Sequence, residues 1–229
     1  MSIKAKELVI FDLDGTLVDS VPDLAASLNH ALETVGRATF AEDTIREWVG
    51  NGAKTLVMRA LSTEEPADAK EGALFEKTLA HFLDHYSKNL CVKSTLYPGA
   101  EELLKELKSI GFKTAIATNK PEPFVEPLLE ELKIAHLFDE IAGAETAPYK
   151  KPHPAPILHL CEALKTPVGK TVMVGDSKND ILAAKSANAL SVAVKHGYNY
   201  GEDIALCGPD FIIDDLSELV DILEAANGR

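Results

Sequence analysis

The chain has 229 residues, of which 46% are hydrophobic and 26% are charged, as is usual for a globular protein with a substantial core. The formal net charge of -13 argues against a nucleic-acid or anionic-membrane partner, because no basic field would offset phosphate repulsion. We find no signal segment, no apolar run of membrane-spanning length and no paired spacing of the three cysteines, so we expect a cytoplasmic protein.

The first predicted element is a buried strand from Leu8 to Phe11, which ends in Asp12, Asp14 and Gly15. The side chains of residues i and i+2 of a strand project from the same face, so an extended backbone would direct both carboxylates toward one point. Like charges aimed at one place repel each other unless a cation or a function compensates. An ordinary turn after a strand explains the same residues equally well. The choice between these interpretations depends on whether polar residues also follow the later strands.

The next part of the chain predicts helices only. Apolar residues from Val21 to Val35 recur at helical spacing, with Ser20 and Asp23 placed as a cap and Gly36 as a stop. Further helices are expected over residues 39–49, 52–61 and 67–89. We therefore expect residues 20–90 to form an all-helical cap domain.

Strands and helices alternate in the remainder of the chain. Strands are expected over residues 113–118, 140–143, 171–175, 190–194 and 211–213, and helices over 100–109, 123–132, 155–164, 180–188 and 215–226. This alternation with short connections is typical of a doubly wound, Rossmann-like parallel sheet. The predicted fold class is therefore α/β, with a core domain of residues 1–19 and 91–229. The inserted helical block would be a lid hinged over a pocket.

In an open parallel sheet, ligands bind beyond the carboxyl ends of the strands. The residues expected there carry carboxylate, hydroxyl, amide and ammonium groups: Asp12, Asp14, Thr118, Asn119, Lys151, Asp176 and Asp180. Each group alone has an ordinary explanation as a turn, cap or solvated loop residue. Together, in this order and each after a strand, they predict a site for a phosphate ester.

The carboxylates have distinct uses at such a site. Asp12 and Asp176 can hold Mg²⁺, which prefers oxygen ligands and is commonly shared with substrate phosphate. Asp12 can also attack phosphorus, giving an aspartyl-phosphate intermediate. Asp14 can protonate the leaving alkoxide and then remove a proton from the water that cleaves the intermediate.

The other polar groups would manage charge around the phosphate. Attack by an anion on a phosphate dianion faces repulsion of about 4 kcal/mol per charge pair at ~4 Å in an intermediate dielectric. Lys151 can neutralise that charge, and the Thr118 hydroxyl can donate a hydrogen bond to a phosphoryl oxygen. Asp180 lies four residues after Asp176 and can orient the metal or its waters.

Four ordered segments resemble the motifs of the haloacid dehalogenase-like hydrolase superfamily: Asp12–Thr16, Thr118–Asn119, Lys151–Pro152 and Gly175–Asp180. The helical insertion resembles the cap of that superfamily. The resemblance implies a magnesium-dependent phosphohydrolase with Asp12 as nucleophile, Asp14 as acid and base, and Thr118 and Lys151 as phosphate ligands. It also implies that Asp12, the backbone carbonyl of Asp14 and Asp176 are the metal ligands.

A finer resemblance points to bacterial phosphoglycolate phosphatases, and it rests on Trp48–Gly52, Tyr97–Gly99, Thr118–Lys120 and Lys151–Pro154. It implies 2-phosphoglycolate, a small phosphorylated metabolite, as the leading substrate, which is hydrolysed to glycolate and phosphate. The cap turn Gly50, Asn51 and Gly52 would then contact substrate, although a plain turn between helices explains it equally well. Cap cations that can meet a second anionic group are Arg46, Lys54 and Arg59.

Several alternatives stay open at this point. Asp14 argues against a dehalogenase, which has no leaving alkoxide to protonate, and against a phosphonate hydrolase with Lys54 as its Schiff-base lysine. A sugar phosphomutase would keep all four motifs. A phospho-accepting receiver protein clusters similar groups but has no use for a helical insertion. The sequence leaves the oligomeric state open between monomer and homodimer.

Overall fold

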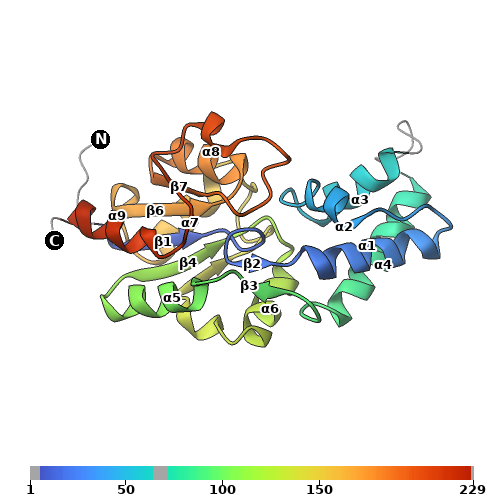
Figure 1. Cartoon of the computed structure of the whole chain (residues 1–229), viewed down its shortest axis with the longest axis horizontal. Helices are drawn as coiled ribbons and strands as arrows, with labels where there is room; N and C mark the ends of the chain where they lie inside the picture. Colours follow the sequence, from blue (N-terminus) through green and yellow to red (C-terminus); the bar gives the residue numbers. More distant parts are fainter. Residues whose placement is uncertain (1–5, 64–71, 228–229) are drawn as a thin grey trace.

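The computed structural model describes residues 6–63 and 72–227, which contain a six-stranded parallel sheet in the order β5-β4-β1-β6-β7-β8 (Figure 1). The strands are β1 (Leu8–Phe11), β4 (Lys113–Ala117), β5 (Glu140–Ala142), β6 (Thr171–Gly175), β7 (Leu190–Val194) and β8 (Phe211–Ile213). Helices flank this sheet on both faces. The α/β, Rossmann-like fold class predicted from the sequence is therefore confirmed.

Strand β1 lies in the middle of the sheet and is buried on both faces. Leu8 pairs with Lys113 of β4 on one side and with Thr171 of β6 on the other. Successive side chains of a strand face opposite ways, so Leu8 packs in the cluster of one face and Val9 in that of the other. The flanking helices are α5 (Ala100–Ser109), α6 (Val125–Glu131) and α9 (Glu218–Asn227) on the Val9 face, and α7 (Ala155–Ala163) and α8 (Lys178–Ala187) on the Leu8 face.

Four helices form a separate cluster beyond the carboxyl end of β1, at the right of Figure 1. They are α1 (Val21–Thr34), α2 (Glu42–Arg46), α3 (Ala53–Ser62) and α4 (Ala73–Lys88). They share an apolar core of their own, in which Leu28, Leu32 and Phe82 are at most 1% exposed. None of the helices in residues 6–63 and 72–227 has both the length and the apolar character needed to span a membrane.

The predicted helices of this cluster need some correction. Helix α2 is shorter than the expected range 39–49, because it begins at Glu42 and ends at Arg46, where residues 47–50 form a turn. The predicted helix over 67–89 corresponds to α4, which runs from Ala73 to Lys88. Residues 67–71 of the predicted range lie outside the described residues. The sequence-based boundaries of the two domains, 1–19 with 91–229 and 20–90, stay our proposal.

The chain crosses between the sheet and the helical cluster twice, and the two crossings lie side by side. Strand β2 (Val18–Asp19) pairs antiparallel with β3 (Thr95–Leu96) in a short ribbon. Asp23, at the start of α1, accepts hydrogen bonds from the backbone N–H groups of Lys93 and Ser94 and from the Ser94 hydroxyl, at 2.7–3.1 Å. This buried carboxylate therefore ties one crossing to the other.

The expectation that Ser20 and Asp23 cap α1 is wrong, because neither side chain forms a capping hydrogen bond there. Asp23 instead binds the second crossing, and the Ser20 hydroxyl donates to Asp14 at 2.6 Å. Both residues have the spacing of a cap, but long-range partners take up their hydrogen-bonding capacity. The four remaining short helical turns are η1 (Glu122–Phe124), η2 (Ala135–Leu137), η3 (Val168–Lys170) and η4 (Ile204–Cys207).

Candidate active site

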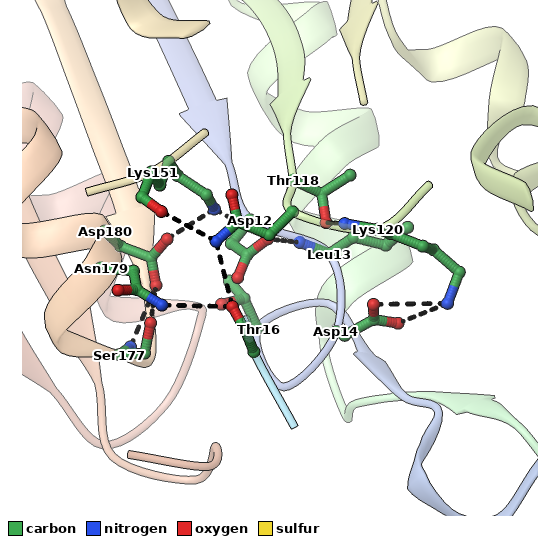
Figure 2. A network of polar contacts seen from close by, with 12 residues as sticks. Asp12, Leu13, Asp14, Thr16, Thr118, Lys120, Lys151, Ser177, Asn179 and Asp180 are labelled. Carbon is green, nitrogen blue, oxygen red and sulfur yellow. Dashed lines mark hydrogen bonds and ion pairs between the residues drawn. The ribbon is translucent and has the colours of Figure 1, made fainter. Parts of the chain in front are cut away.

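A buried lysine links two carboxylates at the carboxyl edge of the sheet. The Lys151 Nζ atom lies 2.9 Å from Oδ1 of Asp12 and 2.6 Å from Oδ1 of Asp180, and Figure 2 shows it pointing between them. Asp12 directly follows β1, and Lys151 comes from the loop between β5 and α7. Segments far apart along the chain thus meet at one point, as the predicted topology requires.

Asp180 is held firmly in this arrangement. Its Oδ2 atom accepts hydrogen bonds from the backbone N–H and hydroxyl of Ser177, at 3.0 and 2.7 Å. The bond from the N–H belongs to a capping box at the start of α8. Its Oδ1 atom accepts from Lys151. Both oxygens of Asp180 are therefore engaged by protein groups.

Asp176 is held by contacts from two other segments. Thr16 donates from its hydroxyl to Oδ1 at 2.9 Å, and the Tyr198 backbone N–H donates to Oδ2 at 2.6 Å. Gly15 packs against the same carboxylate with a φ of +93°, and a Cβ atom there would lie 2.4 Å from Asp176 Oδ2. Only glycine tolerates both that backbone conformation and that close approach.

Three buried carboxylates, Asp12, Asp176 and Asp180, can bring one oxygen each within 4.8 Å of one another. Burial raises the pKa of Asp12 to about 7 against the lowering effect of Lys151, and burial with the charges of Asp180 and Asp12 raises the pKa of Asp176 to about 8. Burial lowers the pKa of Lys151, but the carboxylates of Asp12 and Asp180 outweigh it and raise that pKa. The cluster is thus short of positive charge.

This donor set fits a hard divalent cation. All of the groups are oxygen ligands, and a cation would stabilise the charged carboxylates against the burial and the mutual repulsion that raise their pKa values. The two interactions of Asp12 with Leu13 N–H and Lys151 both reach Oδ1, so Oδ2 is the oxygen best placed for a further ligand. The residues present can therefore hold a divalent metal.

Asp14 lies on the other side of Asp12 from Lys151, among different partners (Figure 2). It accepts a hydrogen bond from the Ser20 hydroxyl at 2.6 Å, and its two oxygens lie 3.0 and 3.3 Å from Lys120 Nζ. The same ammonium group donates to the Tyr86 hydroxyl at 2.5 Å. Burial raises the pKa of Tyr86 to about 12, so its hydroxyl keeps its proton at neutral pH.

Thr118 and Asn119 follow β4 at the same edge, as predicted. The Thr118 hydroxyl oxygen accepts a hydrogen bond from the Lys120 backbone N–H at 3.1 Å, which leaves its proton free to be donated. Asn119 donates from Nδ2 to the carbonyl oxygens of Gly50 and Lys151 at 3.1 and 3.0 Å. Asn119 therefore links the cap turn to the loop that carries Lys151.

A cavity with a free volume of about 40 Å³ opens between the sheet edge and the helical cluster. Its lining includes the core residues Asp12, Asp14 and Thr118 and the cap residues Gly50 and Gly52. The structure thus places the two glycines of the cap turn opposite the carboxylates. The small volume suits a small ligand.

Asn51, between these glycines, faces core residues rather than the cavity. Its side-chain amide lies 2.9 Å from the Tyr200 hydroxyl and 3.1 Å from Asn179 Nδ2. The Asn179 amide also donates to the carbonyl of Gly50 at 3.1 Å. Asn51 therefore links the cap turn to the first turn of α8 and to the loop after β7.

The structure does not bring the expected cap cations to the cavity. Lys54 is exposed on α3 and is not among the lining residues. Arg46 binds Asp19 at 2.9 Å, and Arg59 lies over the ring of Tyr200. The interpretation of Lys54 as a substrate-binding residue gains no support from this arrangement.

Other residues at the site were given no role on sequence grounds. Thr16 lies within the first motif and Lys120 directly follows Thr118–Asn119, so adjacency to a motif would have indicated both. Tyr86 and Tyr198 have no local signal, since both reach the site from far along the chain. Spacing alone does not reveal contacts of that kind.

Comparisons with known proteins agree with this geometry. Residues 9–194 match the family described as haloacid dehalogenase-like hydrolase. The chain is 49% identical over 221 residues to a phosphoglycolate phosphatase of Colwellia psychrerythraea, covering 96% of this chain and 98% of that protein. A second relative, a phosphoglycolate phosphatase of Psychrobacter arcticus, is 47% identical over 222 residues and is matched over 96% of its length, with 95% of this chain covered.

Among solved structures, the chain resembles a predicted phosphoglycolate phosphatase from Haemophilus somnus 129PT with a TM-score of 0.90 and 42% identity. That match covers 96% of this chain and 98% of the other. Sequence motifs, sheet topology and site geometry therefore agree with both kinds of match. The chain belongs to the haloacid dehalogenase-like hydrolase family.

Proposed function

We propose that this chain is a magnesium-dependent phosphatase that hydrolyses small phosphate monoesters, with 2-phosphoglycolate as its leading substrate. The observation that carries the proposal is the buried contact between Asp12 and Lys151, with Asp176 near enough to share a cation. A nucleophilic carboxylate, a cation for phosphate and a metal-binding carboxylate are the groups that phosphoryl transfer through an enzyme-bound intermediate requires.

The proposed metal ligands are Asp12, Asp176 and the backbone carbonyl of Asp14. Mg²⁺ fits these donors because it prefers oxygen ligands and is commonly held by one or two carboxylates together with substrate phosphate. When bound, Mg²⁺ supplies positive charge that offsets the repulsion between a carboxylate and a phosphate dianion. The hydrogen bonds that Asp176 accepts come from an uncharged hydroxyl and a backbone N–H, so its charge is left for a cation. Asp180 accepts one from the Lys151 ammonium group, so it would position Lys151 rather than bind the metal.

In the first chemical step, an Asp12 carboxylate oxygen attacks phosphorus and the ester P–O bond breaks. Asp14 donates its proton to the departing alkoxide, so glycolate leaves with a hydroxyl group. In the second step, Asp14 removes a proton from water as the water oxygen attacks phosphorus. The bond from phosphorus to Asp12 breaks, and inorganic phosphate and the free carboxylate are restored.

The remaining residues would hold the phosphoryl group during both steps. Lys151 lies against Asp12 and would neutralise charge on the transferring group. Thr118, whose hydroxyl proton is free, would donate to a phosphoryl oxygen. Asn119 would keep the Lys151 loop in place through its hydrogen bond to the Lys151 carbonyl.

The helical part, residues 20–90, would act as a cap that closes the cavity around the substrate and excludes water. Its turn at Gly50 and Gly52 lines the cavity, and two relatives matched over 96–98% of their length are named phosphoglycolate phosphatases. The cavity volume of about 40 Å³ supports a compact leaving group such as glycolate.

We also propose a cytoplasmic location and a function without nucleic acid. The described cysteines Cys91, Cys161 and Cys207 carry free thiols, which suits a reducing compartment. The net charge of -13 disfavours a polyanionic partner.

The proposal is tested with a panel of phosphate esters assayed with and without Mg²⁺. The panel contains 2-phosphoglycolate, p-nitrophenyl phosphate, pyrophosphate and glucose 1-phosphate. We expect release of phosphate that depends on Mg²⁺ and is most efficient for 2-phosphoglycolate. Isomerisation of glucose 1-phosphate without phosphate release would instead indicate a phosphomutase. An aspartyl-phosphate that persists for minutes after addition of a phosphodonor would indicate a receiver protein.

A further inference from the structure

Among the described residues that line the cavity, Lys120 is the only cation. Its side chain is 2% exposed and comes from the loop after β4. Much of the surrounding lining is apolar and comes from both parts of the chain: Leu24, Val49, Ala53, Leu56, Phe82 and Phe124. A buried anion in such surroundings is stable only next to a cation or hydrogen-bond donors. Lys120 is thus the group in the cavity able to receive one.

We propose that Lys120, together with the Tyr86 hydroxyl, forms a subsite that binds the carboxylate of the leaving group. This inference rests on the proposed function, and it assigns the recognition of the second anionic group of 2-phosphoglycolate to a core lysine. The sequence had suggested cap cations for this task. Those side chains are exposed or are bound elsewhere, as described above for Lys54, Arg46 and Arg59.

The position of Lys120 relative to Asp14 supports this assignment. Lys120 Nζ lies 3.0 Å from Oδ1 of Asp14, the group that would protonate the leaving oxygen. In 2-phosphoglycolate a single methylene group separates that oxygen from the carboxylate carbon. An ammonium group in contact with the proton donor can therefore reach the carboxylate of the same substrate. A substrate without that carboxylate would leave Lys120 with Asp14 and the Tyr86 hydroxyl as its partners.

Tyr86 extends the subsite across the cavity from the cap. Its hydroxyl accepts a hydrogen bond from Lys120, and this leaves the phenolic proton free for a carboxylate oxygen. The Lys120 ammonium also lies 4.7 Å from the centre of the Tyr86 ring. Because Tyr86 belongs to α4, the complete subsite exists only when the cap lies over the sheet edge. A carboxylate-bearing substrate would therefore favour that closed arrangement.

The test compares two substrates that differ only in the group to be recognised. Ethyl phosphate carries a methyl group where 2-phosphoglycolate carries its carboxylate, and both are assayed with wild type and Lys120→Met in the presence of Mg²⁺. We expect kcat/KM for 2-phosphoglycolate to fall about 1000-fold in the variant, because the substrate carboxylate loses its charge partner. We expect only about a 10-fold loss for ethyl phosphate, which reflects the altered surroundings of Asp14.

Controls separate recognition from structural damage. Lys120→Arg keeps the charge and should preserve most of the preference for the carboxylate substrate. Lys88→Met removes an exposed lysine from the helix that carries Tyr86, and it should leave both rates unchanged. Tyr86→Phe deletes a single hydroxyl and should reduce the preference about 5-fold, a loss typical of one hydrogen bond. It serves as the test even if Lys120→Met fails to fold.

Equal losses for the two substrates in Lys120→Met and no change of preference in Tyr86→Phe would overturn the inference, since Lys120 would then act only through Asp14. That outcome leaves the proposed function intact when wild type still prefers 2-phosphoglycolate. If kcat/KM of wild type is as high for ethyl phosphate as for 2-phosphoglycolate, the proposed substrate is wrong and the carboxylate subsite is refuted with it.

Discussion

A Cβ atom placed on Gly197 would lie 2.1 Å from the Cβ of Asp176, so these two residues leave no room for a methyl group between them. The backbone of Gly197 and the side chain of Asp176 thus fix each other. Because Asp176 is a proposed metal ligand, a substitution of Gly197 should weaken metal binding even though Gly197 itself would not contact the metal.

We predict that Gly197→Ala raises the Mg²⁺ concentration needed for half-maximal activity by about 10-fold, as is common when the support of a metal ligand is displaced. A titration of activity with Mg²⁺ measures the change. Gly169→Ala is the matched control, because a Cβ atom there meets nothing within 4 Å. Equal Mg²⁺ requirements in the two variants would contradict the proposed role of Asp176.

Asp12→Asn should reduce turnover by on the order of 10⁴-fold or more, because it removes the proposed nucleophile. The fold should survive, since the amide has nearly the same shape. Phosphate release and far-UV circular dichroism measure the two effects, with mass spectrometry to exclude deamidation. Asp221→Asn changes an exposed carboxylate of α9 and serves as the control. Retained activity in Asp12→Asn would refute the nucleophile assignment.

Without metal, the thermal stability of the protein should fall as the pH rises from 5 to 8. The raised pKa values of Asp12, about 7, and Asp176, about 8, mean that the folded state keeps protons that the unfolded chain releases near pH 4. Below pH 4 both states are protonated, so the penalty is absent there. It grows until the pH passes the two folded-state pKa values.

Thermal melts of wild type and Asp176→Asn at several pH values isolate this effect from the contribution of histidines. The variant should show a smaller decrease in melting temperature between pH 5 and 8. Added Mg²⁺ should stabilise wild type more at pH 8 than at pH 6, because protons compete with the cation for the carboxylates. Identical pH profiles for the two proteins would show that Asp176 does not titrate in this window.

Asn179→Ala should loosen the contact between the cap turn and the core. The change removes the hydrogen bonds of the Asn179 amide to Gly50 and Asn51 of the cap turn, both at 3.1 Å, and to the Tyr200 hydroxyl at 2.8 Å. We expect KM for 2-phosphoglycolate to rise about 10-fold, the combined value of the two modest hydrogen bonds to the cap turn. Trp48, the single tryptophan of the chain, precedes Gly50 by two residues, so its fluorescence is the readout for movement of this turn.

Asn188→Gly provides the comparison for this experiment at the other end of α8. Asn188 has a φ of 63°, which glycine adopts without strain, so KM and the Trp48 emission should stay as in wild type. A similar KM in Asn179→Ala and wild type would show that the cap turn does not depend on this contact.

Local patterns were sufficient to predict the sheet. The apolar runs of β6, β7 and β8 have the predicted limits, because each is short and bounded by turn residues. The topology rule that gathers the ends of parallel strands then brought Asp12, Lys151 and Asp180 together, as the structure confirms. These inferences need only neighbouring residues and the alternation of elements.

Contacts between distant segments could not be predicted in this way. The ribbon of β2 and β3 pairs strands of two residues, for which no periodicity exists. Ser20 has the spacing of a helix cap, but its hydroxyl binds Asp14. Lys54 carries the right charge for a second anion but lies on the exposed side of α3, and helical spacing did not reveal this. In each of these cases the position of the residue depends on its tertiary surroundings, which local sequence patterns do not contain.

The insertion of the helices directly after β1 has a consequence for the order in which the molecule forms during synthesis. Leu8 must wait for Lys113 and Thr171 before it has neighbours on both sides, and the whole helical cluster leaves the ribosome in the meantime. Apart from Tyr198, the buried residues of that cluster lie between Val21 and Tyr86, so they can pack before the later strands are made. The helical cluster should therefore fold before the parallel sheet that carries the carboxylates.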